Sequence, residues 1–201
     1  MNRVASFISY LLHPIFMPLL SVVILFNLPN YINLRFGPAY FNAVYLCVAF
    51  NLIVIPLSMS HYLKKQGMIS SLKMEKVEER VLPYMVSAIF YGITYFLFYN
   101  IQFPALYLSI FLAASCSVAI LLIFALFKEK VSAHLTGIGG ICGLLIVVNQ
   151  VLGIDTIPLL TVFILLAGLL AAARLKLNAH SAFEVAAGFT LGLSTQLLIL
   201  L

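Results

Sequence analysis

Three short polar segments hold almost all the side chains of this chain that are able to take part in chemistry. They are residues 72–83, 130–135 and 173–184, and they contain arginines, lysines, glutamates and two histidines, His134 and His180. Arginine presents a planar fork of donors that matches phosphate oxygens, and lysine adds a point charge. A neutral histidine can attack phosphorus, and a second histidine can protonate the leaving oxygen. The residue types therefore indicate hydrolysis of a phosphate monoester.

Glu184 follows His180 by four residues, so a helix would bring the two side chains to one face. An attacking imidazole needs a partner on its other nitrogen to fix the tautomer, and a carboxylate is suited to this. A second interpretation stays open. Ser181 and Glu184 have the spacing of a capping box, in which the glutamate would close the start of a helix.

The rest of the chain is apolar enough to cross a membrane repeatedly. Of the 201 residues, 64% are hydrophobic and only 8% are charged, whereas a soluble domain averages roughly 25% charged residues. The mean hydropathy is +1.14. We therefore predict an all-α, polytopic membrane helix bundle that forms one integral membrane domain over residues 1–201.

A helix needs about 20 apolar residues to cross the bilayer core, and seven stretches reach that length. They are residues 7–28, 40–63, 82–99, 104–127, 135–152, 157–173 and 183–201. His13, Pro14 and Pro18 would kink the first stretch, so six or seven transmembrane spans are expected. We interpret His13 and His61 as interfacial or packing residues.

The net charge of +5 does not indicate a nucleic-acid partner, because the basic residues lie in short loops between apolar runs. With seven crossings, ten of the 11 Lys and Arg residues lie on the N-terminal side, and only Arg35 lies opposite. The ten are Arg3, Lys64, Lys65, Lys73, Lys76, Arg80, Lys128, Lys130, Arg174 and Lys176. The positive-inside rule then predicts that the three polar segments face the cytoplasm, in a bacterial inner membrane.

Small residues recur at four-residue spacing in two of the spans. Gly139 and Gly143 form one such pair and Gly188 and Gly192 the other, a pattern that lets helices approach closely. We expect this packing to lie within the chain, with a homodimer face as the alternative. The three cysteines, which have no metal-ligand spacing, are interpreted as buried hydrophobic residues, and no metal or cofactor is expected.

In their order and spacing the polar segments resemble the motifs of the type 2 phosphatidic-acid phosphatase and vanadium haloperoxidase superfamily, in a divergent membrane branch. Its first motif is Lys, six residues, then Arg-Pro; Lys73 and Arg80 have this spacing, while the proline is displaced to Pro83. Its second motif is Pro-Ser-Gly-His, of which Ser132 and His134 are present.

The third motif of the superfamily is the most specific: Ser-Arg, five residues, His, three residues, Asp. Arg174 and His180 stand at these positions, with Ala173 in place of the serine and Glu184 in place of the aspartate. The resemblance covers the chain from about Lys73 to the C-terminus.

The resemblance implies that His180 is the nucleophile, that His134 is the general acid and that Glu184 orients His180. The residues implied to hold phosphate are Lys73, Arg80, Ser132 and Arg174. The implied activity is metal-independent hydrolysis of a lipid phosphate monoester or diphosphate through a phosphohistidine. Phosphatidic acid, phosphatidylglycerophosphate and a polyprenyl diphosphate are the candidate substrates. The alternative is a non-catalytic membrane protein that binds or moves an anionic lipid.

Overall fold

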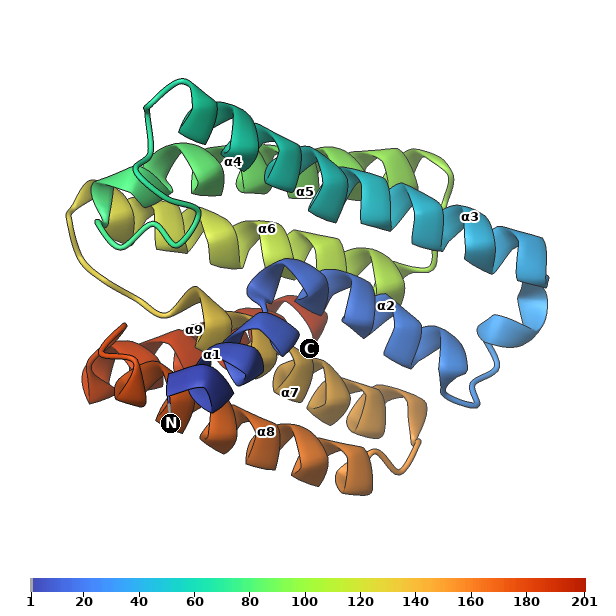
Figure 1. Cartoon of the computed structure of the whole chain (residues 1–201). Helices are drawn as coiled ribbons and strands as arrows, with labels where there is room; N and C mark the ends of the chain where they lie inside the picture. Colours follow the sequence, from blue (N-terminus) through green and yellow to red (C-terminus); the bar gives the residue numbers. More distant parts are fainter. Residues whose placement is uncertain (1) are drawn as a thin grey trace.

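The computed structural model describes residues 2–201, and over these residues it is helical without any β-strand. The α-helices are α1 (Asn2–Leu11), α2 (Met17–Asn27), α3 (Pro38–Ala49), α4 (Ile55–Lys65), α5 (Val81–Asn100), α6 (Ala105–Leu126), α7 (Ala133–Leu152), α8 (Ile157–Lys176) and α9 (Ala182–Leu200). Shorter helical pieces join them: η1 (Pro14–Phe16), η2 (Asn33–Arg35), η3 (Phe50–Val54) and η4 (Glu78–Arg80). Figure 1 shows the long helices running side by side as one bundle.

Seven segments of the bundle are long and apolar enough to span a membrane, which confirms the predicted architecture. They are Arg3–Asn27, Pro38–Lys65, Glu78–Asn100, Ala105–Leu126, Ala133–Leu152, Ile157–Lys176 and Ala182–Leu200. Large apolar side chains cover the outside of the bundle, including Leu46, Phe96 and Leu165, each more than 60% exposed. Because such a surface is unfavourable in water, it is suited to contact with lipid tails.

The first spanning segment is broken in its middle, as its prolines predicted. Helix α1 ends at Leu11, and His13 caps the short turn η1 by accepting a hydrogen bond from the Ile15 N–H at 3.3 Å. The two halves then pack on different partners, α1 against α8 and α2 against α3, α6 and α7 (Figure 1). Irregular backbone at membrane depth is tolerated only where protein buries it or where it lines a cavity.

Helices α7 and α9 make the closest contact in the bundle, and the glycines predicted to mediate packing lie between them. A Cβ atom on Gly192 would overlap the Thr136 carbonyl oxygen, and one on Gly188 would meet the Ser132 carbonyl oxygen. From the other helix, Cβ atoms on Gly139 and Gly143 would strike α9. The prediction that these glycines pack helices within the chain is confirmed.

Gly192→Ala is expected to destabilise the bundle by about 1–3 kcal/mol. The free-energy cost of overpacking there exceeds the roughly 0.5–1 kcal/mol by which alanine stabilises a helix relative to glycine. The measurement is the unfolding temperature of the protein in detergent. Gly168→Ala on α8 is the control, since a Cβ atom there meets no atom within 4 Å. An equal unfolding temperature for both variants would contradict this account of the interface.

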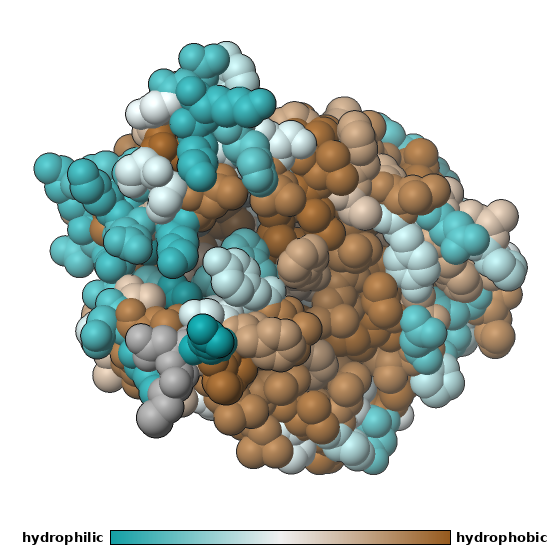
Figure 2. Space-filling model, in the orientation of Figure 1, coloured by the Kyte–Doolittle hydropathy of each residue, from teal (hydrophilic) through white to brown (hydrophobic). Residues whose placement is uncertain are grey.

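The connections that carry the three polar segments all lie at one end of the bundle, drawn on the left of Figure 1. The connections 28–37, 101–104 and 153–156 lie at the other end. In Figure 2, the hydrophilic surface is concentrated at the first of these ends, beside a hollow bordered by apolar side chains. The expectation that the polar segments converge is therefore confirmed.

Candidate active site

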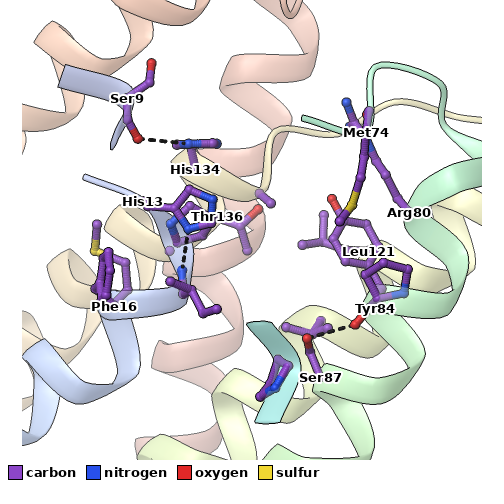
Figure 3. A pocket seen from close by; sticks show the side chains of 18 of the residues that line it. Ser9, His13, Phe16, Met74, Arg80, Tyr84, Ser87, Leu121, His134 and Thr136 are labelled. Carbon is purple, nitrogen blue, oxygen red and sulfur yellow. Dashed lines mark hydrogen bonds between the residues drawn. The ribbon is translucent and has the colours of Figure 1, made fainter. Parts of the chain in front are cut away.

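A cavity of about 840 Å³ reaches from this polar end into the bundle. Its volume lies within the range of roughly 300–1,000 Å³ that is usual for ligand pockets. Five of the seven predicted site residues line it: Lys73, Arg80, His134, Arg174 and His180. Figure 3 shows Ser9, His13 and His134 on one side of the cavity and Arg80 and Tyr84 on the other. Side chains from distant parts of the chain thus line the same cavity.

His180 is held by a short hydrogen bond to Glu184. Its Nδ1 lies 2.7 Å from the Glu184 Oε2, and the His180 side chain is almost wholly buried. Since an ionised carboxylate only accepts, Nδ1–H is the donor, and Nε2 keeps the lone pair of a nucleophile. The Ser181 hydroxyl accepts a hydrogen bond from the Glu184 N–H at 3.3 Å, so it caps α9. The serine half of the predicted capping box is therefore present, while the Glu184 carboxylate bonds to His180.

The surroundings of His180 favour its neutral form. Burial lowers the pKa of His180 below its ordinary value, the bond to Glu184 opposes this, and the positive charges of Arg80 and Arg174 lower the pKa further. The net shift is downward, so the imidazole is neutral at pH 7. A neutral imidazole is the form that can attack phosphorus.

Glu184→Gln is expected to lower kcat, but to keep it about two orders of magnitude above the kcat of a variant without the nucleophile. The orienting carboxylate of a catalytic triad behaves in this way. The amide keeps the shape but no longer fixes the tautomer of His180. The measurement is kcat for the lipid phosphate hydrolysis that the motif resemblance implies. Glu129→Gln is the control, because Glu129 is exposed at the same end and lies outside the cavity lining. A kcat equal to that of the unaltered protein would exclude an orienting role.

His134 is held by the N-terminal half of the broken span. Its Nε2 lies 3.2 Å from the carbonyl oxygen of Ser9, which accepts the hydrogen bond. The ring of His13 stands edge-on to the His134 ring, with centroids 5.2 Å apart (Figure 3). Both histidines line the cavity.

His13 is a site residue that the sequence interpretation missed. The sequence predicts an interfacial or packing residue, and the structure places His13 in the cavity wall as well as against the His134 ring. The available signal was a titratable side chain inside an apolar span beside a helix-breaking proline, since intramembrane ionisable residues usually serve a function. His61 is exposed, and its Nδ1 bonds to the Leu57 carbonyl oxygen, outside this cavity.

Arg80 and Arg174 face the cavity without a carboxylate partner. Arg80 is buried, and its Nε donates to the carbonyl oxygen of Met74 at 3.0 Å. The Nε of Arg174 is buried with no hydrogen-bond partner in residues 2–201. Over the same residues, the one ion pair within 4.0 Å joins His180 to Glu184. Because buried charges are normally paired, two guanidinium groups without a carboxylate partner are typical of a site for an anion.

The other two residues predicted to hold phosphate lie in different surroundings. Lys73 is exposed and lines the cavity at its polar end. Ser132 is completely buried between α7 and α9, outside the cavity lining, where its N–H donates to the Glu184 carbonyl oxygen at 3.1 Å. Ser132 therefore joins the starts of the two helices, and its buried hydroxyl has no hydrogen-bond partner in residues 2–201.

Within residues 2–201, no group of three His, Cys, Asp or Glu side chains is arranged to hold a metal ion. The cavity lining does include four cationic side chains, Lys73, Arg80, Lys130 and Arg174. Comparison with protein-family models, with curated proteins and with solved structures found no match to this chain. The superfamily resemblance thus stays a prediction that rests on the spacing of the motifs.

Proposed function

We propose that this protein is a metal-independent membrane lipid phosphatase that hydrolyses a lipid phosphate monoester or diphosphate through a phosphohistidine. One observation supports this above the others. His180, fixed through Nδ1 by Glu184, lies in the same cavity as two arginines that have no carboxylate partner in residues 2–201. A nucleophile beside an unpaired cationic pair is what a phosphoryl-transfer site requires.

In the proposed reaction, Nε2 of His180 attacks phosphorus, an N–P bond forms, and the bond from phosphorus to the leaving oxygen breaks. His134, held as the imidazolium by the negative charge of the bound phosphate, gives a proton to that oxygen and becomes neutral. Water then attacks the phosphohistidine and passes a proton to His134, the N–P bond breaks, and phosphate leaves with His180 again neutral and His134 again the imidazolium. Arg80 and Arg174 stabilise the negative charge on the other phosphate oxygens during both steps.

A lipid substrate is supported by where the site lies. The polar residues are at the ends of apolar spans, the depth at which lipid headgroups lie. Deeper in the cavity, Ile110, Ala114, Val118 and Leu121 of α6 form an apolar wall. A phosphate at the cationic end and a hydrocarbon chain against this wall would be accommodated together.

The test is phosphate release by the detergent-purified protein from phosphatidic acid, phosphatidylglycerophosphate and a polyprenyl diphosphate, with EDTA present. We expect metal-independent release from at least one lipid and a large loss in the double variant Arg80→Ala/Arg174→Ala. Lys176→Ala is a control for charge, because Lys176 lies outside the cavity lining. Tight lipid binding without release would instead favour a protein that binds or moves an anionic lipid.

The proposed orientation places the site on the cytoplasmic side, because ten of the 11 Lys and Arg residues lie at that end in the seven-span topology. In a variant without native cysteines, Lys65→Cys is expected to stay unlabelled by an impermeant thiol reagent on intact cells. Arg35→Cys, exposed at the opposite end, is the matched control and is expected to react. The reverse pattern would show that the site faces outward.

A further inference from the structure

The cavity continues past the cationic residues to the middle of the membrane-spanning region. Gln196 of α9 lines its inner part and packs against Gly140 and Gly143 of α7. These glycines follow His134 by six and nine residues, which is about 9–14 Å along the helix axis. The inner end of the cavity thus lies well below the residues proposed for catalysis.

Gln196 has a polar group at this depth that the protein leaves unsatisfied. Its side chain is 5% exposed, and its Nε2 has no hydrogen-bond partner in residues 2–201. Its neighbours are satisfied, because the hydroxyl groups of Ser117 and Thr195 bond to each other at 2.6 Å. An unpaired amide in apolar surroundings is unfavourable, so the amide of a residue that lines the cavity is suited to an acceptor on a ligand.

We propose that the Gln196 amide donates to a carbonyl oxygen of the ester linkage of the substrate, and so selects an ester-linked glycerolipid. This inference rests on the proposed function and narrows its substrate class. A glycerolipid carries ester carbonyls between its phosphate and its hydrocarbon chains. A polyprenyl chain has no acceptor beyond its phosphates and would leave the amide unpaired. Sites built around a buried hydrogen bond discriminate against ligands that lack the partner.

The test compares two phosphatidic acids that differ only in having ester or ether links to the same chains. The unaltered protein is expected to have a kcat/KM about tenfold higher for the ester lipid, the effect of one hydrogen bond. Gln196→Met keeps the side-chain volume and is expected to bring the ester lipid down to the ether value. Ser194→Ala is the control on the same helix, outside the cavity lining, and is expected to keep the ratio.

Equal kcat/KM values for the ester and ether lipids in the unaltered protein would overturn the inference and leave the phosphatase proposal standing. An ester preference that Gln196→Met does not change would also overturn it, since the amide would then hold only water. If neither lipid is hydrolysed, phosphate release from phosphatidylglycerophosphate and from the polyprenyl diphosphate tests the proposed function. In that case the same ester-to-ether comparison is made on Kd, where a ratio of one overturns the inference by itself.

Discussion

His180→Ala is expected to lower kcat for lipid phosphate hydrolysis by about four to six orders of magnitude. The variant removes the atom that would form the N–P bond, and no other histidine in the cavity has its Nδ1 held by a carboxylate in residues 2–201. With labelled substrate, the unaltered protein is expected to accumulate an acid-labile phosphoenzyme, which the variant lacks.

His61→Ala is the control for this experiment, because it removes an exposed histidine of α4 that lies outside the cavity. It is expected to retain both the activity and the phosphoenzyme. If His180→Ala still accumulates labelled protein, another residue is the nucleophile. A loss of both signals together with a lowered unfolding temperature would call for His180→Gln, which keeps the polar bulk beside Glu184.

His134→Ala is expected to lower kcat by about two to four orders of magnitude for lipids, whose alkoxide leaving group needs a proton. The loss should be far smaller for p-nitrophenyl phosphate, because nitrophenolate leaves without one. Ratios of kcat for the two substrates therefore separate a general acid from a residue that only shapes the cavity. An equal loss on both substrates would exclude the general-acid role.

The spans and the meeting of the polar segments could be predicted from sequence because both follow from local properties. Apolar runs of about 20 residues with short connections fix where helices begin and end. Helices that alternate in direction then bring every second connection to the same end, so residues around His134 and His180 must share it. The break at Pro14 was equally visible, since proline removes a helical donor.

What could not be predicted depends on contacts between segments far apart in the chain. Ser9 and His134 are separated by 125 positions, so nothing near either residue indicates their hydrogen bond. In the sequence, Gln196 is one polar residue in an apolar helix. Its place in the cavity wall depends on its packing against α7, which the sequence does not show. The complete burial of Ser132 could not be predicted for the same reason, because it depends on the packing of α9 against α7.

The glycine contact between α7 and α9 also sets the geometry of the two histidines. His134 lies in the first turn of α7, and His180 immediately precedes the start of α9. Gly188 and Gly192 face backbone atoms of α7, so no flexible side chain can move aside to make room for an added Cβ atom. Selection for activity should therefore tolerate substitutions at these two glycines less than selection for folding alone does. The difference between the two selections in the substitutions tolerated at these glycines would then measure how closely activity depends on the spacing of the two histidines.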